Sequence, residues 1–92
     1  MNKYESVVII NPNVEENALK ELIERFQTLI NTDGKVEQVN ELGKKKLAYE
    51  INKNKEGYYV VYDFEANPKL IAELERNYRI TDEIIKLIVV KK

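Results

Sequence analysis

Two stretches of this chain repeat apolar residues at every third or fourth position, and runs rich in β-branched residues stand before, between and after them. The three-to-four spacing predicts amphipathic helices, and the short β-branched runs predict strands. We therefore expect helices at residues 14–32 and 68–79, and strands at residues 3–10, 36–52, 58–65 and 84–90. With 92 residues in all, these segments fill a single domain, residues 1–92.

The order βαββαβ is that of the ferredoxin-like split-βαβ fold. It predicts an α+β domain in which two helices cover one face of a four-stranded antiparallel sheet. Asn13, with Glu16 three positions later, is the expected cap of the first helix, and Asn67-Pro68 is the expected start of the second. Gly43 predicts a bend or bulge within the second strand. Residues expected to be largely buried are Leu22, Ile23, Phe26, Val60, Tyr62, Leu74 and Leu87.

The composition argues against catalysis. The chain has no Cys and no His, so thiolate metal ligands and the commonest general base are both missing. The loop after the first strand, Asn11-Pro12-Asn13, lacks the glycines and the arginine of acylphosphatase-like enzymes. We expect no catalytic residue, metal, cofactor or small-molecule substrate. The apolar runs are shorter than the roughly 20 residues that span a bilayer, and the amino terminus does not resemble a signal peptide, so we expect a cytosolic protein with no membrane contact.

Charge is distributed unevenly along the chain. The net charge is only -1, which alone argues mildly against nucleic-acid binding. Residues 12–34 hold five acidic side chains against two basic ones, whereas residues 44–55 hold five lysines against one glutamate. Lys3, Lys86, Lys91 and Lys92 form a second basic set on the first and last strands, which are neighbours in a ferredoxin-like sheet. The pattern predicts a polar molecule that is acidic on its first helix and basic on a hairpin and a sheet edge.

Both faces of the first strand carry apolar residues. Val7 and Ile9 alternate with Ser6, Val8 and Ile10, so helices on one side of the sheet would leave apolar side chains on the other. This pattern is typical of a half-covered central strand or of a surface that binds another protein. The run Lys44-Lys45-Lys46 is typical of a protected sheet edge or of a phosphate contact. Gly57-Tyr58-Tyr59 matches the aromatic motif of RNA-recognition domains poorly, so we expect no base stacking there.

Several short strings resemble one known family over essentially the whole chain. They are Tyr4-Glu5, Asn11-Pro12, Glu41-Leu42-Gly43, Lys45-Lys46-Leu47-Ala48-Tyr49, Ile51, Gly57-Tyr58 and Val89-Val90-Lys91. The chain resembles the bacterial small-subunit ribosomal protein S6 family, with Gly43 to Ile51 as the most specific stretch. Glu50 stands where the family often has proline, and lysines stand where it often has arginines. The resemblance implies a structural constituent of the small ribosomal subunit that binds the central domain of 16S rRNA together with ribosomal protein S18.

Binding of rRNA together with a partner protein would explain both the near-neutral charge of the chain and the apolar residues on the second face of its sheet. The competing interpretation is a ferredoxin-like domain that oligomerises or senses a small molecule and has no RNA role. Under the ribosomal interpretation we expect phosphate contacts through lysines. The expected rRNA-binding residues are Lys3, Lys53, Lys55, Lys86, Lys91 and Lys92. The expected partner surface consists of Val7, Ile9, Lys44, Lys46, Tyr59 and Val61.

Overall fold

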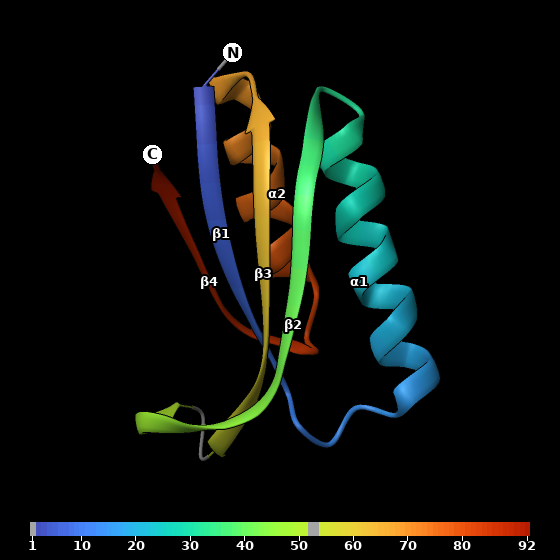
Figure 1. Ribbon diagram of the computed structural model, residues 1–92. Coiled ribbons are helices and arrows are strands. Elements are labelled where there is room, and N and C mark those ends of the chain that lie inside the picture. Colours follow the sequence, from blue (N-terminus) through green and yellow to red (C-terminus); the bar gives the residue numbers. More distant parts are fainter. Residues whose placement is uncertain (1, 52–53) are drawn as a thin grey trace.

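A computed structural model of the protein, which describes residues 2–51 and 54–92, has the predicted order of elements (Figure 1). Strands β1 (Asn2–Ile10), β2 (Gly34–Ile51), β3 (Asn54–Ala66) and β4 (Ile84–Lys91) form one antiparallel sheet in the order β2-β3-β1-β4. Helices α1 (Glu16–Asn31) and α2 (Pro68–Ile80) lie on one face of this sheet. The predicted ferredoxin-like fold is confirmed.

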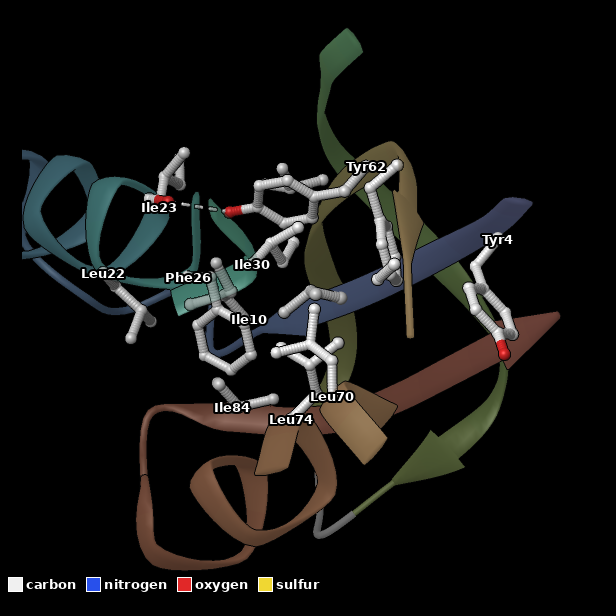
Figure 2. Packing of buried hydrophobic residues seen from close by; sticks show 14 residues of the cluster. Tyr4, Ile10, Leu22, Ile23, Phe26, Ile30, Tyr62, Leu70, Leu74 and Ile84 are labelled. Carbon is white, nitrogen blue, oxygen red and sulfur yellow. Dashed lines mark hydrogen bonds between the residues drawn. The ribbon is translucent and has the colours of Figure 1, made fainter. Parts of the chain in front are cut away.

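The core lies between the helices and one face of the sheet, where residues two apart point inward (Figure 2). Val60, Tyr62 and Phe64 of β3 are at most 1% exposed, which confirms the predicted inner face of this strand. The hydroxyl of Tyr62 donates a hydrogen bond of 3.0 Å to the carbonyl oxygen of Ile23, so the one polar atom of this ring has a partner. Of the residues predicted to be buried, six are buried and Leu87 is only half-buried, because β4 is an edge strand.

The first helix begins later than the sequence predicts. The residue before its first turn is Glu15, whose side chain makes no capping hydrogen bond, so Asn13 is not the cap. The Oδ1 atom of Asn11 instead accepts a 2.9 Å hydrogen bond from the Asn13 N–H, which closes a turn ahead of the helix. Asn67-Pro68 does start α2, although the Asn67 amide donates to the carboxylate of Asp33 at 3.0 Å rather than to the helix.

The hairpin of β2 and β3 is longer than predicted and extends beyond the rest of the sheet. β3 begins at Asn54, inside the expected turn, whereas β1 pairs only with residues 58–66 of β3. Figure 1 shows the remaining end of the hairpin bending away from the sheet. The register of β2 shifts between Glu41 and Gly43, and Gly43 has a φ of 80°, so the predicted bulge is confirmed. In the described part of the chain, no helix has the length and apolar character needed to cross a membrane.

Candidate nucleic-acid and partner interface

The sheet face that the helices leave uncovered has an apolar centre. Val7 on β1 lies opposite Val61 on β3 and opposite Ile88 on β4, so three neighbouring strands contribute one row of branched side chains. Ile88 is 39% exposed, while Val7 and Val61 are half-buried. Tyr59 is also half-buried and stands in the next row. This row with Tyr59 forms a partly exposed apolar surface on the face opposite the two helices.

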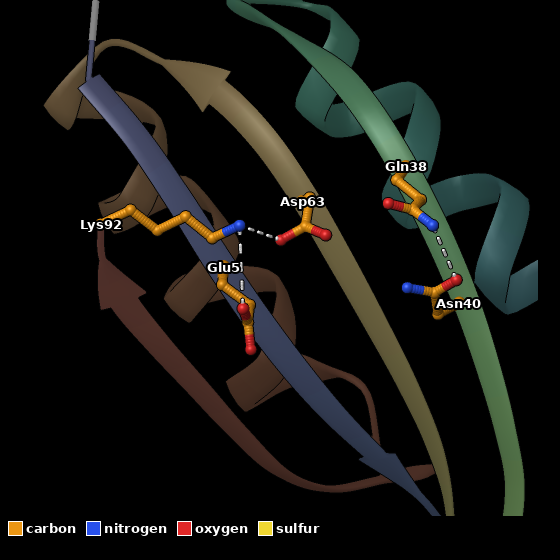
Figure 3. Close-up of polar contacts among 5 residues, drawn as sticks. All are labelled: Glu5, Gln38, Asn40, Asp63 and Lys92. Carbon is orange, nitrogen blue, oxygen red and sulfur yellow. Dashed lines mark hydrogen bonds and ion pairs between the residues drawn. The ribbon is translucent and has the colours of Figure 1, made fainter.

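One end of this face is polar, and its polar side chains form hydrogen bonds and ion pairs with one another (Figure 3). The Nζ atom of Lys92 lies 2.7 Å from Asp63 Oδ1 and 3.9 Å from Glu5 Oε2. The hydrogen bond with Asp63 raises the pKa of Lys92 above its usual value, so this lysine is charged at neutral pH. Gln38 Nε2 donates to Asn40 Oδ1 at 3.2 Å on the adjacent strand β2. These groups give the apolar centre a hydrogen-bonded rim.

The other end of the face leads onto the projecting hairpin, which is basic. Lys44, Lys45, Lys46 and Lys55 are all exposed there. The nearby Tyr58 hydroxyl donates to Glu41 Oε1 at 3.1 Å; burial, together with this carboxylate, raises the pKa of Tyr58. The predicted rRNA contact Lys53 lies outside the described residues. The exposed lysines place positive charge beyond the end of β1.

The structure does not bring all the residues of the expected partner surface together. Lys44 pairs with Tyr58 and Lys46 with Glu56, so both belong to the helix side of the hairpin, away from Val7, Tyr59 and Val61. The register assigns Lys45 instead to the open side, because Leu42 is the extra residue of the bulge and shifts the alternation by one position.

Ile9 is on the open face but is only 4% exposed. The hairpin bends over Ile9 at Gly57, where a Cβ atom would collide with the Ile9 side chain. Ile9 therefore supports the surface from below and offers little area to a partner.

The four lysines of the first and last strands do not converge either. Lys3 and Lys92 are neighbours, since the Lys92 N–H donates to the Lys3 carbonyl at 2.9 Å. Lys86 lies opposite Ile9, six residues and about 20 Å further along β1 at about 3.3 Å per residue. Lys91 pairs with Tyr4 and lies on the helix side of the sheet. The strands are adjacent as predicted, but the side chains are divided between two faces and two ends.

Sequence reasoning missed three residues of the open surface: Lys45, Ile88, and Val90, which lies opposite Glu5 and is 53% exposed. Ile88 could have been found, because alternation within residues 84–90 places it on the face opposite Leu87. Lys45 could not have been found without the position of the bulge. Among residues 2–51 and 54–92, no three acidic side chains are arranged to hold a metal ion, and no buried side-chain nitrogen or oxygen lacks a hydrogen-bond partner.

The fold and these surfaces define a ferredoxin-like binding module with an apolar open sheet and a lysine-bearing hairpin. The family model described as "Ribosomal protein S6" matches residues 3–91. The small ribosomal subunit protein bS6 of Clostridium novyi is 50% identical over 91 residues, covering 98% of this chain and 96% of that protein. The corresponding protein of Halalkalibacterium halodurans is 48% identical over 92 residues, covering 99% and 97%.

A solved structure agrees with these sequence relatives. The crystal structure of 30S ribosomal protein S6 from Thermotoga maritima superimposes with a TM-score of 0.94 at 40% identity, covering 99% of this chain and 87% of that one. The chain belongs to the ribosomal protein S6 family. It is a structural protein of the small ribosomal subunit, is located on the ribosome in the cytoplasm, and is not an enzyme.

Proposed function

We propose that this chain binds the central domain of 16S rRNA as a heterodimer with ribosomal protein S18. The observation that carries the proposal is the division of its exposed surface into an apolar sheet face and a basic hairpin, on a molecule with a net charge of only -1. A chain with so little excess positive charge gains limited affinity from phosphate contacts alone. A basic partner seated on the apolar face would add the missing contacts.

The open sheet face fits a protein partner better than RNA. Its central row of Val7, Val61 and Ile88 carries no charge and no hydrogen-bonding side chain, so it offers nothing to a phosphate or to a base edge. An apolar centre inside a polar rim is the usual composition of a protein interface. The ion pair of Lys92 with Asp63 and the Gln38–Asn40 hydrogen bond supply such a rim on one side.

The hairpin lysines fit the phosphate backbone of RNA. Lys45 and Lys55 are exposed on a hairpin end that no other strand flanks, so their long side chains reach solvent freely. Lysine offers a point charge rather than a forked donor, and such contacts position a protein without reading sequence. Lys3, Lys53, Lys86, Lys91 and Lys92 remain predicted rRNA contacts beside them.

Calorimetry of this chain with purified S18 tests the partner surface. Ile88→Asp places a charge in the exposed apolar row, and its exposure leaves the fold intact. We expect affinity to fall about thirtyfold or more, since a central interface residue is worth about 2 kcal/mol or more. Ile80→Asp is the control, because Ile80 is 73% exposed at the end of α2 and lies outside this surface. Equal affinities for the two variants would refute this placement of the partner.

A further inference from the structure

A groove lies on the opposite side of the sheet, between α2 and the edge strand β4. α2 buries Leu70 and Leu74 in the core, while Leu87 and Val89 on the helix side of β4 are only half-buried. Leu87, Val89 and Ile71 form the apolar floor of the groove. The groove is open along β4, because β4 is an edge strand of the sheet. The groove is thus accessible to a long chain molecule as well as to a small one.

Two positively charged side chains line this groove. Arg79 lies in the last turn of α2, and Lys91 lies near the end of β4 opposite Tyr4. Both are exposed, and within the described residues neither forms an ion pair. Arg76, three residues earlier on the same helix, is by contrast paired with Glu73 at 2.9 Å. Arg79 and Lys91 are therefore available to an anionic ligand.

The groove also contains an aromatic wall and one acid. The Tyr78 hydroxyl donates to the Ile85 carbonyl at 3.1 Å, which holds the tyrosine ring beside β4. Glu75 lines the groove as well, and its carboxylate accepts hydrogen bonds. A ligand that fits has an anionic group for the two cations, a flat apolar part for the floor, and an N–H donor for Glu75. An acidic peptide segment without aromatic residues meets the first requirement but brings no flat apolar part for the floor.

We propose that this groove binds one unpaired nucleotide of ribosomal RNA. Arg79 and Lys91 hold its phosphate, and the base lies on the apolar floor beside Tyr78, as unpaired bases pack on apolar and aromatic side chains in other RNA-binding proteins. The inference rests on the proposed function, which supplies the RNA, but it adds a second contact surface on the side of the sheet away from the partner. Lys91 thereby contributes to RNA binding apart from Lys3 and Lys92.

Salt titrations of binding to a central-domain rRNA fragment, measured by fluorescence anisotropy with S18 present, test this groove. Arg79→Gln and Lys91→Gln each remove one positive charge and keep a polar side chain of similar length. We expect each variant to reduce the slope of log affinity against log salt concentration by about 0.7. When salt is lowered from 1 M to 0.1 M, the affinity of each variant should therefore rise about fivefold less than that of the unmodified chain. Arg76→Gln is the matched control on the same helix outside the groove, and it should behave as the unmodified chain.

A crosslink supplies the second readout. RNA carrying 4-thiouridine at its unpaired positions should crosslink to the peptides that contain Tyr78 or Leu87, and the yield should drop in the Arg79→Gln variant. If the unmodified chain binds RNA but Arg79→Gln and Lys91→Gln match Arg76→Gln, or if crosslinks map only to the hairpin, the groove is not the site. If the unmodified chain with S18 does not bind the fragment at all, the proposed function itself is wrong.

Discussion

At the scale of single residues, Phe26 is the side chain on which the core depends most visibly. It is 2% exposed, and its ring lies 6.5 Å from that of Tyr62 (Figure 2). Phe26→Ala should lower the free energy of unfolding by about 3–5 kcal/mol, because it removes buried area and leaves a cavity. Urea unfolding measures this, with Ile80→Ala as an exposed control expected within about 0.5 kcal/mol. A loss below about 1 kcal/mol would show that the core closes around the missing ring.

The buried phenol of Tyr62 should make the free energy of unfolding depend on pH in the alkaline range. Burial raises its pKa strongly above the usual 10.0, so the folded chain keeps the phenol proton where the unfolded chain loses it. The contribution is complete below pH 10 and is lost as pH rises, by about 1.4 kcal/mol per pH unit. Tyr62→Phe should cost about 1 kcal/mol at pH 7 for the hydrogen bond to Ile23 and should reduce the alkaline slope by one proton. Urea titrations between pH 9 and pH 12 compare the slopes, and equal slopes would contradict the prediction.

At the scale of elements, periodicity predicts the helices and the inner face of β3 well, because both bury one continuous side. The start of α1 was missed because the Asn11 side chain accepts a hydrogen bond from the Asn13 N–H, which places Asn13 in a turn ahead of the helix rather than at its cap. The face assignment of Lys44, Lys45 and Lys46 was missed for a different reason. A bulge adds one residue, so every later side chain of the strand moves to the opposite face. Gly43 indicates that a bulge lies nearby, but the sequence does not show which residue is the extra one.

Gly43 itself is a testable part of that bulge. Its φ of 80° lies in the left-handed region, and a Cβ atom there would meet no neighbour, so any cost of substitution arises from the backbone alone. Gly43→Ala should destabilise the protein by about 1–2 kcal/mol. Gly43→Asn should cost less, since asparagine tolerates this region better. Thermal unfolding of both variants measures the two losses of stability. Equal losses would indicate that the left-handed conformation of Gly43 does not maintain the bulge.

The hairpin is the second element with its own prediction. Lys55→Ala should weaken rRNA binding and flatten its salt dependence by about one unit, as expected for the loss of one phosphate contact. Lys20→Ala is the control, because Lys20 lies on α1 at 3.6 Å from Glu16, in the acidic part of the chain. Identical salt slopes for the two variants would move the RNA contact away from the hairpin.

At the scale of the whole molecule, charge and apolar area are separated in space. The projecting hairpin carries exposed lysines, the open sheet face has an apolar centre, and the groove beside α2 carries Arg79 and Lys91. The net charge of the chain is only -1, so we expect weak RNA binding by this chain alone. We therefore expect tight RNA binding only when a partner adds its own contacts.

The measurement that tests this most directly is the affinity of the chain for a central-domain rRNA fragment with and without S18, by filter binding at fixed salt. A coupling of about 1–3 kcal/mol is typical of linked sites, so affinity should rise by about fivefold to about a hundredfold when S18 is present. The Ile88→Asp variant should lose that gain while keeping the weak affinity of the chain alone. The same affinity with and without S18 would contradict the proposed binding of rRNA as a heterodimer.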